Sequence, residues 1–132
     1  GRTLRINTWT RRAAALAVGA TAVVALTAGS ASAASTLAKG SYGSAVGCLQ
    51  QGLNYVDSAG LKVDNDFGGL TYNAVVHYQS GHSLSPDGVV GPATGGSIKN
   101  AVSWAYNASN HGGDHSPELG AWLVNCSGQL PG

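Results

Sequence analysis

One pattern of residues occurs twice in the middle of the chain and constrains the fold more than any other feature. The first copy is DNDFGGLTYNAV, residues 64–75, and the second is DGVVGPATGGSI, residues 87–98. Asp, Gly, Thr and a β-branched residue recur in step, each 23 residues after its counterpart. A period of this length is typical of a repeated supersecondary unit. Two related structural units are therefore expected.

Each copy predicts a turn followed by a helix. Asp64 and Asp87 favour turns, because the carboxylate accepts hydrogen bonds from backbone amides just ahead of it. The Gly at the fifth position of each copy, Gly68 or Gly91, suits a helix N-cap, and Pro92 suits the first helical position of the second copy. Helices are expected from about Gly69 to Ser80 and from Pro92 to about Tyr106. A catalytic carboxylate pair is the less favoured interpretation of the two Asp.

The apolar positions assign the predicted faces of three helices. A helix beginning at Ser44, a suitable N-cap, would bury Val46, Leu49 and Leu53 at i, i+3 and i+7, before a loop from Tyr55 to Val63. The buried positions expected in the two repeat helices are Leu70, Ala74, Val75 and Tyr78, then Ile98, Val102 and Tyr106.

Together these segments resemble a known family. The runs DNDFGGLTYNAVVHYQ and PDGVVGPAT, preceded by V-x-x-L-Q-x-x-L-N at residues 46–54, are similar to the peptidoglycan-binding domain found beside many bacterial cell-wall hydrolases. The resemblance covers roughly residues 37–98. It implies an all-α fold, a small three-helix bundle with the repeats related by an approximate two-fold axis. One departure is Gly95, where the family has Trp; Trp104 or Trp122 is the candidate to refill that space.

The resemblance also implies a ligand, the glycan strand or stem peptide of peptidoglycan, bound non-covalently in a shallow groove. Sugars stack on aromatic rings and need fixed polar partners for their hydroxyls. The predicted ligand-binding residues are Tyr42, Asp64, Asn65, Asp66, Tyr72, Gln79 and Trp104. Phe67 and Tyr78 are instead assigned to the core. No cofactor, metal or catalytic residue is predicted, and a separate cell-wall hydrolase is a possible partner.

The N-terminus has the pattern of a secretory signal peptide, residues 1–33. Four Arg fall within residues 2–12, an apolar run covers 13–29, and Ala31-Ser32-Ala33 supplies a cleavage site. A membrane anchor is the alternative interpretation, and Sec and twin-arginine export both remain open. The predicted order is then a flexible linker at 34–40, a peptidoglycan-binding-like domain at 41–106 and a C-terminal tail at 107–132. A secreted, cell-wall-associated protein without a membrane segment after cleavage is expected.

Charge and cysteine content narrow the function further. Without residues 1–33, three Lys remain against five Asp and one Glu, so the net charge is 3 − 6 = −3. No Lys/Arg cluster is present there, so nucleic acid is not expected as a ligand. Cys48 and Cys126 predict one disulfide that staples the tail to the first helix, with Trp122, Leu123 and Val124 covering the core. A free reactive thiol is the alternative.

Two other functions remain open. His111, Asp114 and His115 could hold a metal in a small cell-wall hydrolase, although two Gly separate the histidines and no third partner is evident. The fold could also serve an extracellular structural protein that assembles with itself. The sequence favours a secreted, non-catalytic module that binds peptidoglycan.

Overall fold

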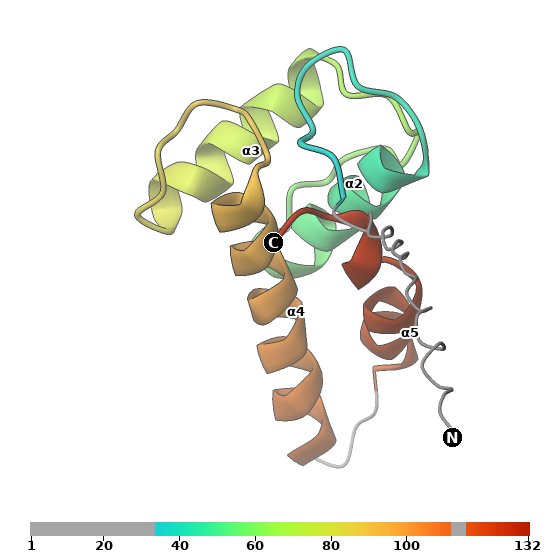
Figure 1. Ribbon diagram of the computed structural model, residues 1–132. Coiled ribbons are helices and arrows are strands. Elements are labelled where there is room, and N and C mark those ends of the chain that lie inside the picture. The colour runs from blue at the N-terminus through green and yellow to red at the C-terminus, as the bar shows by residue number, and fades with distance from the viewer. Residues whose placement is uncertain (1–33, 112–115) are drawn as a thin grey trace, which may run out of the picture. The chain divides into compact units, whose positions relative to one another are not determined.

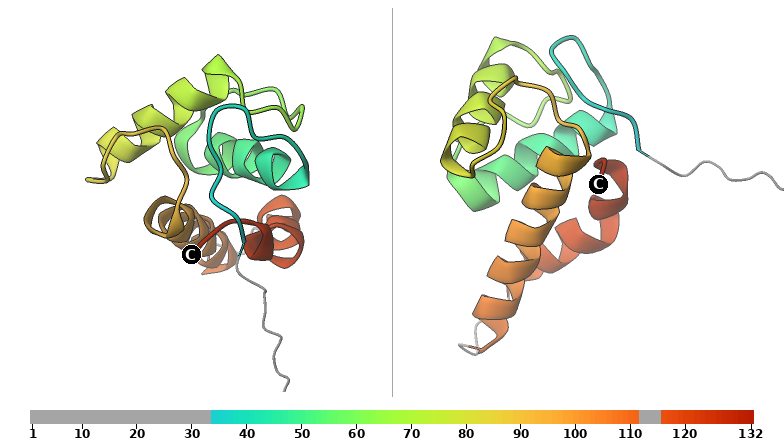
Figure 2. Two further views of the ribbon diagram at one scale, coloured as in Figure 1. Left: turned by 45° about the horizontal axis from the view of Figure 1, so that its top comes forward. Right: turned by 60° about the vertical axis from the view of Figure 1, so that its left-hand side comes forward.

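The computed structural model describes residues 34–111 and 116–132, within the compact unit Ala34–Gly132. The predicted signal peptide lies outside the described residues. The elements are the helices α2 (Ser44–Asp57), α3 (Gly69–Gly81), α4 (Pro92–His111) and α5 (Pro117–Asn125), then the short 3₁₀ helix η2 (Ser127–Gln129). Helix α2 packs against α3 on one side and against α4, α5 and η2 on the other (Figures 1 and 2). Helix α2, rather than either helix of the repeat, is therefore the centre of the bundle.

Helix α2 confirms the predicted apolar stripe. Val46, Leu49 and Leu53 are fully buried. The N-cap, however, is Gly43, whose φ of 131° favours glycine; Ser44 is the first helical residue and its hydroxyl donates to Gln129. The helix also continues to Asp57, so the following loop begins later than predicted.

The two repeat helices begin where the sequence predicted. Val75 and Tyr78 of α3 are fully buried, but Leu70 is 79% exposed, so its assignment to the buried face was wrong. Thr71 takes the inward position instead, because it lies seven residues before Tyr78, close to two full turns of helix. Helix α4 buries Ile98 and Val102 as predicted and runs beyond Tyr106.

The C-terminal tail contains a further helix, α5, in a segment that the sequence left unclassified. Trp122 is 2% exposed, and its indole N–H donates to the carbonyl of Cys48 at 2.8 Å. The disulfide between Cys48 and Cys126 joins α2 to the residue after α5, with Cα atoms 5.4 Å apart, which confirms the predicted pairing. Val124 is 83% exposed and does not cover the core, contrary to expectation.

Segments near the two ends of the unit Ala34–Gly132 close the core. A Cβ at Gly95 would overlap the carbonyl of Pro131, so the tail lies over the position where the family has Trp. The expectation that Trp104 or Trp122 refills this space was wrong: Trp104 is 73% exposed and Trp122 packs beside Gly52. Near the start of this unit, Leu37 is 6% exposed and pairs with Val90 through backbone hydrogen bonds of 3.1 and 2.8 Å. This pairing fixes part of the segment predicted to be a flexible linker.

Candidate functional site

A buried glutamine organises the turn of each repeat. In the first, the Gln50 amide donates to the Asp64 carboxylate at 2.9 Å, to the Asp66 carbonyl at 3.1 Å and to the Thr71 hydroxyl at 3.1 Å. Its oxygen accepts the backbone N–H groups of Asp64 and Asn65, both at 3.1 Å. Gln50 itself is 1% exposed. The turn is therefore held from inside by one side chain of α2.

The second repeat contains the same network. The Gln79 amide donates to the Asp87 carboxylate at 3.0 Å, to the Val89 carbonyl at 2.9 Å and to the Thr94 hydroxyl at 3.0 Å. Its oxygen accepts the N–H of Gly88 at 2.9 Å. Gln79 was predicted to contact ligand from the surface, but it is 1% exposed and lies in the core. Its polar atoms are already used by the turn.

These networks support the structural assignment of both repeated carboxylates. Asp64 accepts the N–H of Asp66 at 3.1 Å, and Asp87 accepts the N–H of Val89 at 2.9 Å. The hydrogen bond from Gln50 lowers the pKa of Asp64 below its ordinary value, with help from that turn amide. The turn amide of Val89, and then Gln79, lower the pKa of Asp87 in the same way.

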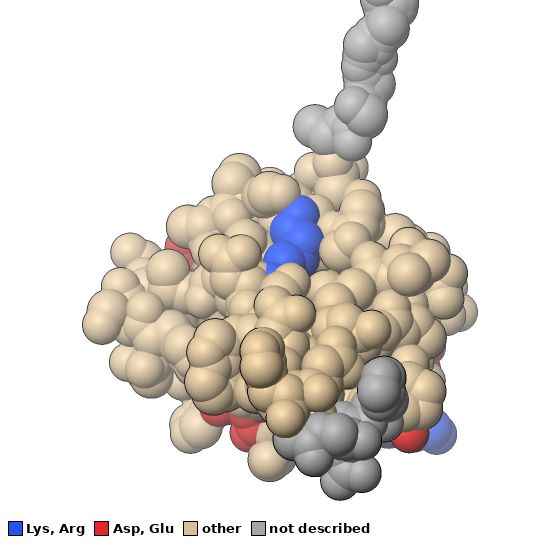
Figure 3. Space-filling model, turned by 90° about the horizontal axis from the view of Figure 1, so that it is seen from below, with Lys and Arg blue, Asp and Glu red and all other residues tan. Residues whose placement is uncertain are grey.

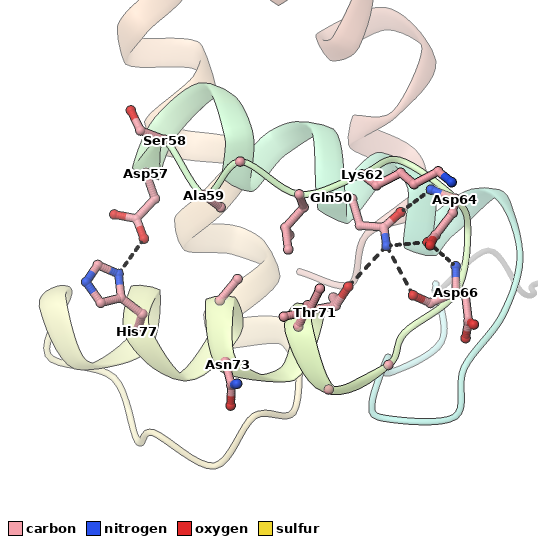
Figure 4. A pocket seen from close by; sticks show the side chains of 16 residues that line it. Gln50, Asp57, Ser58, Ala59, Lys62, Asp64, Asp66, Thr71, Asn73 and His77 are labelled. Carbon is pink, nitrogen blue, oxygen red and sulfur yellow. Dashed lines mark hydrogen bonds and ion pairs between the residues drawn. The ribbon is translucent and has the colours of Figure 1, made fainter.

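A groove of about 660 Å³ lies beside the first network (Figure 4). It is bounded by the end of α2, the loop 58–66 and the exposed face of α3. That face presents a helical stripe at i, i+3, i+4 and i+7, made of Leu70, Asn73, Ala74 and His77.

The two ends of the groove carry most of its charge. At one end, Asp57 pairs with His77 through an oxygen–nitrogen distance of 2.9 Å. At the other, Lys62 lies with Asp64 and Asp66 (Figure 4). Aliphatic side chains, including those of Ala59 and Leu61, also line the groove, and Ala59 lies between the two ends (Figure 4). The groove can therefore accept an extended, partly apolar molecule with polar groups at its ends.

The structure brings only two of the predicted ligand-binding residues into this groove, Asp64 and Asp66. Tyr42 is 79% exposed and is joined to Asp66 only by a backbone bridge. The Tyr72 ring packs over Gly88 of the second turn, and Asn65 directs its side-chain oxygen at Gly47 of α2. Trp104 lies exposed on α4. These four residues stay untested predictions and do not line the groove.

Sequence reasoning missed most of the groove. Asp57 and Lys62 belong to the segment predicted to be a loop, and His77 was not among the predicted ligand-binding residues. The available signal was the stripe on α3, since residues 70, 73, 74 and 77 share one helical face. It was obscured because Leu70 and Ala74 had been placed on the buried face.

The alternative metal site is only partly described. The Nδ1 atom of His111 lies 2.8 Å from the Asn107 carbonyl, while Asp114 and His115 lie outside the described residues. Within residues 34–111 and 116–132, no three His, Cys, Asp or Glu side chains are grouped to hold a metal ion.

No helix in these ranges is long and apolar enough to cross a membrane. On the face seen in Figure 3, the charged side chains are sparse.

The segment that contains the groove is similar to a known family. Residues 42–97 match the profile of the family described as "Putative peptidoglycan binding domain". A crystal structure of a peptidoglycan-binding protein from Clostridioides difficile, in complex with glutamine hydroxamate, is 38% identical over 48% of this chain, with a TM-score of 0.47. This chain covers 40% of that protein. No curated protein sequence matches. Residues 42–97 thus form a domain like those of the peptidoglycan-binding family, which confirms the predicted resemblance.

Proposed function

We propose that the chain is a secreted, non-catalytic module that binds bacterial peptidoglycan in the groove between α2 and α3. The observation that carries this proposal is the position of the groove. All of its lining residues, from Gln50 to His77, fall inside the segment 42–97 that matches the family. A groove of about 660 Å³ also falls in the usual size range for ligand sites in proteins.

The chemistry of the lining favours the stem peptide over the glycan as the part held in the groove. Carboxylates, an ammonium group and the Asn73 amide are suited to peptide groups, and the Ala and Leu side chains are suited to alanine methyls. The proposed location outside the cell rests on the signal-peptide pattern of residues 1–33. A separate cell-wall hydrolase is the proposed partner, brought to the wall by the bound module.

A binding assay with one groove-filling variant tests the proposal. The oxidised chain is pelleted with purified insoluble peptidoglycan, and release of soluble fragments is followed in the same tubes. We expect co-pelleting without release. Gly69→Phe should reduce co-pelleting at least tenfold, because Gly69 lines the groove and a Cβ there meets no atom within 4 Å.

Gly128→Phe is the matched control. It adds the same ring at a glycine that also has no neighbour within 4 Å and lies outside the groove. Equal binding by Gly69→Phe and the unaltered chain would place the ligand elsewhere. Release of wall fragments by the unaltered chain would overturn the non-catalytic assignment.

A further inference from the structure

We infer that the groove selects wall material carrying a free primary ammonium group, as the uncrosslinked diamino acid of a stem peptide does. This inference rests on the proposed function and adds the chemical group that the groove recognises. The charges of the groove attract such a group, and the second repeat shows which of those charges the fold requires.

The groove has an excess of negative charge. Three carboxylates line it, those of Asp57, Asp64 and Asp66, against the single ammonium of Lys62. By formal charge, with His not counted, the lining carries 1 − 3 = −2. A cation is therefore attracted to the groove, whereas a free carboxylate is repelled.

A smaller hollow of about 260 Å³ in the second repeat provides an internal comparison. Each of its eight lining residues lies 23 positions after a residue that lines the groove. Leu84 corresponds to Leu61, Gly91 to Gly68, and Thr94 to Thr71. Both copies of the repeat therefore have a concavity at the same place, and the one in the second copy is smaller.

The charges differ between the two copies. Ser85 stands in place of Lys62, and Val89 in place of Asp66. Val89 supplies its turn with the same backbone N–H and C=O groups that Asp66 supplies. The turn thus forms without either charged side chain. The formation of the turn therefore does not explain why Lys62 and the Asp66 carboxylate are present.

The arrangement within the groove fits an alkyl ammonium. Figure 4 shows Asp57 near one end and Asp66 near the other, with Ala59 between them. An aliphatic chain can lie along the small apolar side chains while its ammonium reaches a carboxylate. One Asp57 oxygen pairs with His77, which leaves the other to accept from a ligand.

The experiment compares purified peptidoglycan before and after acetylation of its free amines, which removes their positive charge. The full oxidised chain should bind acetylated wall about three- to tenfold more weakly than mock-treated wall. Binding to untreated wall should weaken as salt is raised, because partly exposed charges are screened. Equal binding to the two preparations would overturn the inference and leave the proposed function standing. Binding to neither would overturn both.

Three variants, each of which changes the charge by one unit, distinguish attraction of the ligand to the groove from an effect of the overall charge of the chain. Asp66→Asn should weaken binding to untreated wall about two- to fivefold, the range of one exposed charge pair. Lys62→Gln should strengthen it by a similar factor, which damage to the fold would not do. Glu118→Gln, on α5 and outside the groove, changes the net charge equally and should have no effect. Identical responses of Asp66→Asn and Glu118→Gln would contradict recognition at the groove.

Discussion

The side chain of Gln79 is expected to contribute more to stability than its polar character suggests. Gln79→Leu would remove the acceptor for the Gly88 N–H and the donor to the Asp87 and Thr94 side chains. Each buried group left without a partner costs about 1–3 kcal/mol. We expect a loss of about 3 kcal/mol or more in the free energy of unfolding, measured with urea. Gln51→Leu is the control, because Gln51 is only half-buried and makes one long contact, 3.8 Å, with the Cys126 sulfur.

The carboxylates of the two turns predict how stability depends on pH. Folding lowers the pKa of Asp64 and of Asp87 below the ordinary value of 3.8, so both favour the folded state when ionised. Their contribution is present above pH 3.8 and is lost as the pH falls through the lowered folded-state values. Urea unfolding between pH 2 and 6 measures this slope. The double variant Asp64→Asn, Asp87→Asn should flatten it, and an unchanged slope would contradict the assignment.

The two buried glutamines also show why part of the site was not predictable. The Asp, Gly and Thr of the repeats keep one spacing, so comparison at a fixed period finds them. Gln50 precedes its Asp by 14 residues, whereas Gln79 precedes its Asp by 8. No fixed period relates the two glutamines. Gln79, which is buried among the hydrogen bonds of its turn, was therefore predicted to be a ligand-binding residue at the surface.

Among the elements, the second turn is expected to be the less tolerant of a side chain at its glycine. Gly88 has a φ of 73°, and a Cβ there would overlap the ring of Tyr72. Gly60 has a similar φ of 65° with no atom within 4 Å of a Cβ, so it isolates the backbone cost. We expect Gly60→Ala to cost about 1–2 kcal/mol and Gly88→Ala at least 1 kcal/mol more.

A double-mutant cycle checks the cause of that difference. If the Tyr72 ring is responsible, Gly88→Ala should cost about as little as Gly60→Ala when Tyr72 is already Ala. Thermal or urea unfolding of the four proteins measures the coupling. A cost of Gly88→Ala that is independent of Tyr72 would show that the backbone conformation alone sets it.

Helix positions were easier to predict than helix faces. The N-caps and the first-position Pro fixed the starts of α3 and α4 through local chemistry. The buried face of α3 depends instead on contacts with α2 and α4, which no local pattern specifies. Hence Leu70 was assigned to the core, and the stripe that contains it was not recognised as a groove wall. Helix α5 was not classified from the sequence, because the segment is short and its one buried residue, Trp122, is held by a contact with α2.

For the whole molecule, the disulfide is expected to decide whether the tail stays folded. It joins residues separated by 78 positions, for which loop entropy predicts about 4 kcal/mol of stabilisation. The tail contributes Trp122 and Leu130 to the core, and Pro131 covers Gly95. Reduction should therefore lower the urea midpoint sharply and expose Trp122, which tryptophan fluorescence would report. The double variant Cys48→Ala, Cys126→Ala should match the reduced chain and respond no further to reductant. Equal midpoints for the oxidised and reduced chains would mean that packing of α5 on α2 alone holds the tail in place.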